Sequence, residues 1–370
     1  MRTSPPFRAD HVGSLLRPPA LLRARETLTG DALREAEDEA IKDVVRKQQE
    51  AGLQSATDGE FRRASWHMDF IYRLSGIGQA ADERITVQFH NEQGDLEYTP
   101  AALRVNDRIR LTEPIFADDF TFLRDTVGTT APALRPKLTI PSPSMVHYRG
   151  GPASIDPAVY PDIEEFWRDL SAAYAEQVRR IGALGCTYLQ FDDTSLAYLN
   201  DPAQRAEMSE RGDDAEHLHL RYIRQINAAL AAKPAGMTIT THMCRGNFQS
   251  SWVASGGYDF VAEALFGELK VDGFFLEFDD ERSGGFEPLR FVPPGKMVVL
   301  GLVTTKRGEL ESKDALKRRI DEAAKFIDLD QLCLSPQCGF SSTVEGNRLT
   351  EDEQFAKIRL IVETAQDVWG

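Results

Sequence analysis

Residues 238–247 read TITTHMCRGN, and residues 273–280 read GFFLEFDD. Each stretch opens with β-branched or aromatic residues and then becomes polar, which is typical of a buried parallel strand ending at one edge of a sheet. Short runs of this kind alternate with longer amphipathic stretches, and the alternation predicts repeated βα units. The predicted strands lie near 9–12, 53–57, 135–140, 188–191, 238–241, 273–276, 297–302 and 331–334.

Helices predicted between these strands complete the pattern. Eight strands with intervening helices fit a closed parallel barrel better than an open sheet, because crossovers between parallel strands are almost always right-handed. The predicted fold class is therefore α/β, a (β/α)₈ TIM barrel, and one domain accommodates all 370 residues. Apolar residues at helical spacing place the helices near 31–51, 163–184, 214–232, 313–326 and 351–368.

One segment departs from this alternation of strands and helices. Residues 85–90 and 96–99 are β-like and flank a polar turn at 91–95 that contains Gly94, and a third β-like run follows at 108–112. We expect a small antiparallel β insertion at about 84–112, between the second and third barrel strands. A lid, a dimer contact and a structural decoration all fit this insertion, so the sequence leaves a monomer and a homodimer open.

The composition excludes several classes of protein. With 42% hydrophobic residues the chain can bury a large core, and its net charge of −15 disfavours nucleic acid or an anionic membrane as a partner. No apolar run approaches the roughly 20 residues that span a bilayer, and the N-terminal residues lack the apolar core of a signal peptide. Four cysteines are too few for a disulfide framework. We therefore expect a cytoplasmic protein whose cysteines are core residues or metal ligands.

Four residues that follow three of the predicted strands form a candidate metal site. His242 and Cys244 stand two apart just after the fifth strand, where both side chains can point the same way. Glu277 ends the sixth strand, and Cys338 lies in a loop just past the eighth. Because the carboxyl ends of barrel strands converge on one mouth, the four side chains are offered to one small volume. Imidazole, thiolate and carboxylate groups are zinc ligands, so the predicted cofactor is Zn²⁺.

Each of these residues also has a simpler interpretation. Cys338 fits an unreactive loop thiol, Glu277 a surface acid and His242 a hydrogen-bonded barrel histidine. Their joint placement after three strands favours the metal site. Cys186 and Cys333 provide a contrast, because one lies in a helix–strand connection and the other within a strand. Both are expected to be small buried apolar residues rather than ligands.

Further polar residues follow other predicted strands and are expected at the same mouth. Carboxylates there can bind an ammonium group, as an amino-acid substrate requires. A turn before Gly59 explains Asp58 equally well, whereas two acids that end an apolar strand favour function. The residues concerned are His11 and Ser14 after the first strand, Asp58 and Glu60 after the second, Ser142, Ser144 and His147 after the third, and Asp192 and Asp193 after the fourth.

Together these motifs resemble the cobalamin-independent methionine synthase family, in particular its shorter, single-barrel members. The resemblance implies a zinc ion bound by His242, Cys244, Glu277 and Cys338. It covers nearly the whole chain. The matching motifs are FRADHVGSLLRP (7–18), TDGEFRR (57–63), QFDDTSL (190–196), THMCRGN (241–247), FFLEFDD (274–280) and LSPQCGF (334–340).

The same resemblance implies a substrate and a reaction. Ser14 would contact the carboxylate of homocysteine, and Glu60 and Asp192 would hold its amino group. His11 and Asp193 complete the expected set of substrate-binding residues. The implied reaction transfers a methyl group to the homocysteine thiol and gives methionine. The expected donor is 5-methyltetrahydrofolate, as 5-methyltetrahydropteroyltriglutamate, or a related compound.

The differences from the family all concern the methyl donor. Full-length members carry an N-terminal barrel that helps to bind polyglutamylated folate, and no such barrel is expected here. The family's Asp–His element after the seventh strand corresponds to GLVTTKRGE (301–309), with Lys306 where the histidine is expected. Lys306 is therefore the candidate catalytic proton donor. The family tryptophan that faces the pterin is replaced within SMVHY (144–148).

Two other functions stay open. A zinc-thiolate alkyltransferase would use another electrophile or thiol, such as a corrinoid methyl donor, or an epoxyalkane with coenzyme M. Coenzyme M would require cationic side chains for its sulfonate, whereas Glu60 and Asp192 suit an ammonium group. A non-catalytic zinc-binding protein is the second alternative, because structural zinc sites are also closed by four ligands. The position of the candidate site among acids at the barrel mouth favours catalysis.

Overall fold

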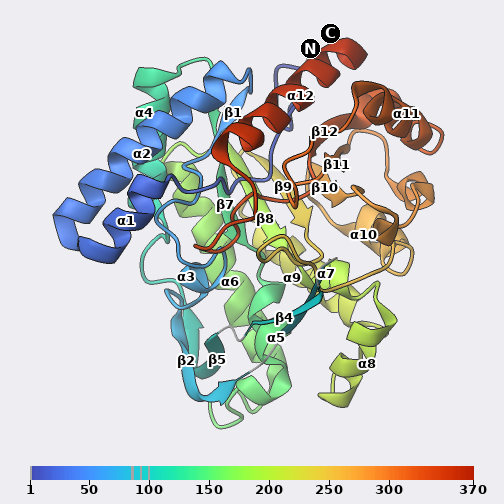
Figure 1. Ribbon diagram of the computed structural model, residues 1–370. Helices are drawn as coiled ribbons and strands as arrows, with labels where there is room; N and C mark the ends of the chain where they lie inside the picture. Colours follow the sequence, from blue (N-terminus) through green and yellow to red (C-terminus); the bar gives the residue numbers. More distant parts are fainter. Residues whose placement is uncertain (1, 85–86, 92–93, 99–100) are drawn as a thin grey trace.

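The computed structural model describes residues 2–84, 87–91, 94–98 and 101–370 (Figure 1). Six parallel strands form a continuous sheet in the order β12–β11–β10–β9–β8–β7, so neighbours in the sheet are consecutive strands of the barrel. The strands of the barrel are β1 (Ser55–Ala56), β6 (Arg135–Pro136), β7 (Leu138–Pro141), β8 (Tyr188–Asp193), β9 (Thr238–Met243), β10 (Gly273–Glu277), β11 (Met297–Val303) and β12 (Leu332–Pro336).

Two short segments occupy the remaining positions of the barrel. β1 pairs in parallel with β6, which directly precedes β7. Ala9 forms a parallel bridge with Leu334 of β12, and the Leu15 N–H donates to the Gly59 carbonyl after β1 (3.1 Å). The predicted first strand is thus reduced to a single bridge. The arrangement agrees with the predicted (β/α)₈ barrel.

Helices lie around the outside of the sheet (Figure 1). The five predicted helices correspond to α2, α6, α9, α11 and α12. The sequence did not reveal α4, because Phe116 at its N-cap has a φ of +60° and provides no side-chain cap. The helices of four or more residues are α1 (Pro19–Thr27), α2 (Gly30–Glu50), α3 (Met68–Ile71), α4 (Ala117–Thr130), α5 (Ser144–Gly150), α6 (Ile163–Ala183), α7 (Ser195–Tyr198), α8 (Pro202–Glu210), α9 (Leu218–Leu230), α10 (Ala262–Glu268), α11 (Lys313–Ala323) and α12 (Glu351–Trp369).

An antiparallel insertion separates β1 from β6. β2 (Ser75–Arg84) pairs with β5 (Ala101–Arg110), and β3 (Val87–Asn91) pairs with β4 (Gly94–Tyr98). The antiparallel strands begin at Ser75, earlier than the predicted 84, because the Gly- and Ala-rich β2 has a weak strand pattern. Parts of the predicted insertion, at 85–86, 92–93 and 99–100, lie outside the described residues. The organisation as a single domain stays a prediction.

Apolar side chains from the strands and the surrounding helices form one large buried cluster. This packing fixes the strands of the sheet and therefore holds their carboxyl ends at defined positions. Among the described residues, no helix is both long enough and apolar enough to cross a membrane.

Candidate metal centre and active-site cavity

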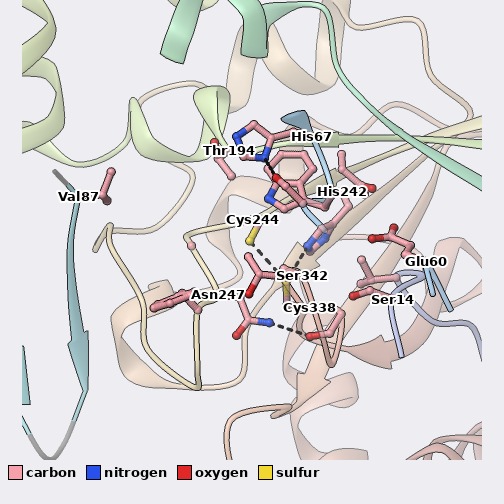
Figure 2. A pocket seen from close by; sticks show the side chains of 18 of the residues that line it. Ser14, Glu60, His67, Val87, Thr194, His242, Cys244, Asn247, Cys338 and Ser342 are labelled. Carbon is pink, nitrogen blue, oxygen red and sulfur yellow. Dashed lines mark hydrogen bonds between the residues drawn. The ribbon is translucent and has the colours of Figure 1, made fainter. Parts of the chain in front are cut away.

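The four predicted metal ligands come together at the carboxyl ends of the barrel strands. His242 and Cys244 stand at the end of β9, Glu277 ends β10, and Cys338 follows β12. The Sγ atom of Cys338 lies 3.4 Å from the Sγ atom of Cys244 and 3.4 Å from Nε2 of His242 (Figure 2). One ligand atom from each of the four residues lies within 4.8 Å of all the others, and all four residues are buried.

This donor set fits a zinc ion. At ordinary Zn–S and Zn–N bond lengths, the ligand atoms around a tetrahedral ion lie roughly 3.5–3.8 Å apart, so the cluster needs little adjustment to hold one. Oε2 of Glu277 is buried and has no hydrogen-bond partner among the described residues. Its ion pair with the Arg282 guanidinium is long, at 4.0 Å. A buried carboxylate oxygen that accepts no hydrogen bond is costly, and coordination of a cation would remove that cost.

Cys338 differs in its pKa from the other three cysteines, since the hydrogen bond to Cys338 and burial raise the pKa of Cys244 well above its usual value. The pKa of Cys338 lies well below its usual value, because a hydrogen bond from Cys244 and the nearby His242 imidazole stabilise its thiolate. By contrast, burial raises the pKa of both Cys186 and Cys333 to about 12. Cys186 and Cys333 are buried within the protein, as their sequence positions indicated.

Arg245 fixes the position of Glu277 through backbone and side-chain hydrogen bonds. Its backbone N–H donates to Oε1 of Glu277 (3.2 Å), and its buried guanidinium donates to the Glu277 carbonyl (3.1 Å) and to the Tyr258 hydroxyl (3.0 Å). That hydroxyl in turn accepts the Glu277 N–H (2.8 Å). The sequence analysis did not identify Arg245, although a charged residue directly after Cys244 in a buried strand end was an available signal. Such supporting residues fix the orientation of metal ligands.

Two buried carboxylates face the same cavity as the cluster. Glu60 and Asp192 line it together with Ser14 and with three of the four clustered residues. Glu60 accepts a hydrogen bond from Thr139 Oγ1 (2.5 Å), and its backbone has a φ of +61°, a strained conformation for a residue other than glycine. Burial raises the pKa of Glu60 and raises that of Asp192 to about 7. Both carboxylates would be stabilised by a cationic group bound in the cavity.

Ser14 is positioned by the loop that carries Cys338. The Ser341 N–H donates to Ser14 Oγ (3.3 Å). A Cβ atom at Gly339 would stand 2.0 Å from Ser14 Oγ, which is closer than any real contact. Glycine at 339 therefore allows the Cys338 loop to close directly onto Ser14.

Comparison with known proteins identifies the family. The sequence pattern described as the cobalamin-independent synthase, catalytic domain, matches residues 144–367, more than half of the chain. The chain belongs to the cobalamin-independent synthase family. This membership confirms the resemblance inferred from the motifs, and the family points to methyltransferase activity of the methionine-synthase type.

Relatives in this family extend over the whole chain. The uncharacterized protein YxjH of Bacillus subtilis is 46% identical over 370 residues, which cover 98% of this chain and 95% of the relative. A methionine synthase of Pyrococcus abyssi is 24% identical over 333 residues, 89% of this chain and 84% of the relative. A crystal structure of a putative vitamin-B12-independent methionine synthase from Listeria monocytogenes is 39% identical, with a TM-score of 0.77, and the match covers 99% of this chain and 98% of that one. These similarities confirm the α/β fold class.

Three residues predicted to bind the substrate or to donate a proton are not among the residues that line the cavity, and neither is the predicted metal ligand Glu277. Asp193 accepts the Ser195 hydroxyl (2.9 Å) at the end of β8. His11 is buried, its pKa is lowered to about 3 by burial, and its ring nitrogens have no partner among the described residues. Lys306 donates to Oδ2 of Asp279 (2.7 Å). The roles expected for these three residues stay predictions.

The wall of the cavity away from Glu60 contains residues that the sequence analysis did not identify. Nδ1 of His67 lies 3.1 Å from Oγ of Ser65. The ring centroids of His67 and Trp66 are 4.4 Å apart. Burial, and then the charge of Arg149, lowers the pKa of His67 well below its usual value, so the imidazole is neutral. The signal available in the sequence was SWH (65–67), an aromatic–histidine pair shortly after the second barrel strand.

Proposed function

We propose that this protein transfers a methyl group to the thiol of homocysteine and gives methionine, with a zinc ion held by His242, Cys244, Glu277 and Cys338. The observation that carries the proposal is the buried cluster of these residues beside two buried carboxylates in one cavity. The expected donor is 5-methyltetrahydrofolate, as the mono- or triglutamate, or a related compound. The methionine synthase name of the Pyrococcus relative supports the assignment.

The residues of the acidic wall would hold the amino acid. Glu60 and Asp192 would bind its ammonium group, because both carboxylates are buried and face the cavity. The Ser14 hydroxyl would donate to its carboxylate. An amino acid bound in this way directs its side-chain thiol towards Cys244 and Cys338.

A zinc ion, when bound, keeps a substrate thiol in the reactive thiolate form at neutral pH. The protein contributes orientation and the exclusion of water. Arg245 and Tyr258 fix Glu277 through the hydrogen bonds described above. Val12, Phe89 and Phe248 supply apolar surface to the cavity. Fixed groups in a cavity poor in water act more strongly on a charged nucleophile than the same groups in water.

The experiment measures metal content, homocysteine binding and methionine formation with the full chain. Methyltetrahydrofolate, as mono- and triglutamate, and methylcobalamin are offered in parallel as donors. Turnover with folate supports the complete proposal, and turnover with methylcobalamin alone indicates a corrinoid donor. Zinc without homocysteine binding would contradict the proposal and indicate either another thiol, such as coenzyme M, or a structural zinc site.

A further inference from the structure

A second cavity adjoins the metal cavity on the side away from the acids. It has a volume of about 350 Å³ and shares Val87, Arg149 and Tyr198 with the metal cavity. In the close-up view, Val87 lies across the thiol cluster from Glu60 and Ser14 (Figure 2). The metal cavity therefore has one acidic end and one end that continues into a further chamber.

Arg149 stands where the two cavities meet. It comes from α5 and is half-buried, and its Nε atom is buried without a hydrogen-bond partner. Among the described residues no carboxylate forms an ion pair with it, whereas the nearby Arg211 pairs with Asp213 (4.0 Å). A guanidinium that is partly removed from water and lacks an anionic partner carries an uncompensated desolvation cost. An anion bound at this position would offset that cost.

His67 provides a second, independent polar group on the same wall. Its side chain is 5% exposed and lines the metal cavity, and its Nε2 atom is buried without a partner among the described residues. Ser65 Oγ accepts the Met68 N–H (3.3 Å) and lies 3.1 Å from Nδ1 of His67. With the serine proton directed to Nδ1, the neutral ring carries its own proton on Nε2 and donates into the cavity.

Two aromatic side chains add apolar surface to the metal cavity, which both polar groups also line. The rings of Phe89 and Phe248 pack with centroids 5.3 Å apart. Backbone hydrogen bonds in both directions between His90 and Trp252 (2.7 and 2.9 Å) hold β3 of the insertion over this region. The metal cavity therefore has an apolar surface beside these donors, while the chamber beyond it is also lined by the carboxylates of Asp201 and Glu207.

We propose that the chamber at Arg149 binds the second substrate of the reaction, and that Arg149 and His67 recognise an oxyanion, a carboxylate or a phosphate, on that substrate. The inference rests on the proposed function. When the amino acid occupies the acidic end and its sulfur lies at the thiol cluster, the reaction partner approaches from the remaining side. A guanidinium and an imidazole N–H both donate, so they suit an acceptor group with negative charge.

The test measures binding of two simple probes, acetate and inorganic phosphate, to the full chain by titration calorimetry. Wild-type protein is expected to bind at least one of them, and the preferred probe distinguishes a carboxylate ligand from a phosphate ligand. Arg149→Gln is expected to weaken that affinity about tenfold, because a hydrogen bond to a charged group is lost, and His67→Gln about threefold. Arg149→Lys retains the charge and is expected to recover part of the loss.

A matched control removes a cation elsewhere on the surface. Arg290 is exposed, donates to the Glu287 carbonyl and is not among the residues that line either cavity, so Arg290→Gln is expected to leave anion binding unchanged. The absence of saturable binding of either probe to the wild type would overturn the inference. Equal affinity in wild type and Arg149→Gln would do the same.

Homocysteine binding, measured on the same variants, separates this inference from the proposed function. If homocysteine does not bind while anion affinity depends on Arg149, the proposed function fails and the anion site stands. If homocysteine binds and is methylated while Arg149→Gln leaves the anion affinity unchanged, the inference fails and the proposed function stands.

Discussion

The two ends of the cavity are built by different means. At the acidic end, Glu60 and Asp192 stand at or just past the ends of strands, and hydrogen bonds from Thr139 and Gln190 hold them. At the other end, Arg149 comes from a short helix and Val87 from the insertion, and Nε of Arg149 has no hydrogen-bond partner in the part of the chain that the structure describes. Strand ends hold their side chains in a fixed geometry, whereas helices and insertions added to the barrel can differ in length and position. We therefore expect the acidic end to define one reactant and the opposite end to vary with the other.

The largest effect is expected on zinc affinity, when a thiol of the metal cluster between the two ends of the cavity is removed. Cys338→Ser is expected to lower zinc affinity by more than about a hundredfold, because even residues that support zinc ligands contribute 10–100-fold. Metal content after dialysis against a chelator measures the loss, and Cys186→Ser, a change at a buried core thiol, is the control. Full zinc occupancy in Cys338→Ser would show that the ligand assignment is wrong.

A smaller effect is expected at the acidic end. Glu60→Gln should weaken homocysteine binding by about 10–100-fold, since a hydrogen bond between charged groups contributes about 1.5–3 kcal/mol. Zinc content should not change. Titration with 4-mercaptobutyrate, which lacks the amino group, provides the comparison. If Glu60→Gln weakened binding of both thiols equally, Glu60 would have no role in holding the ammonium group.

The contact between Gly339 and Ser14 offers a test of how the acidic end is joined to the metal site. A methyl group in Gly339→Ala would meet Ser14 Oγ, so we expect homocysteine affinity to fall by about tenfold, the factor of a 1.4 kcal/mol loss. In the double variant Ser14→Ala/Gly339→Ala the clash with Oγ is removed. Its affinity should match that of Ser14→Ala alone, and additive losses would indicate that the two residues act separately.

The last effect concerns the dependence of the free energy of unfolding on pH, to which two buried histidines contribute. Burial lowers the pKa of His11 and of His147 to about 3, although Asp213 Oδ1 lies 3.5 Å from His147 Nε2. Each histidine is neutral in the folded state and protonates near pH 6.5 when unfolded. As pH falls from about 6.5 towards 3, each therefore lowers the free energy of unfolding by up to about 1.4 kcal/mol per pH unit.

Denaturant unfolding between pH 7 and 5 measures this slope. In His147→Gln and in His11→Gln the slope should correspond to about one proton fewer taken up on unfolding in each variant. An unchanged slope in either variant would mean that its histidine takes up a proton in the folded protein.

The acidic end and the metal cluster could be predicted from the sequence because each of their residues follows a strand. Strand ends in a barrel converge, so His242, Glu277 and Cys338 could be placed together without coordinates. Arg149 and His67 could not be placed in this way, since they belong to a helix and a turn whose direction depends on tertiary packing. The start of the insertion was also missed, because β2 has few β-branched residues.

The close approach of Gly339 to Ser14 has a consequence for how the site forms after the chain is synthesised. The loop that supplies Cys338 also closes the pocket at Ser14, so both features form together when this loop docks. If the site binds zinc and homocysteine as proposed, a chain in which this loop has not docked would lack one metal ligand and one wall of the amino-acid pocket. On the proposed function, both parts of the site would form in one step, and protease resistance of residues 338–341 should appear at the same time as metal binding.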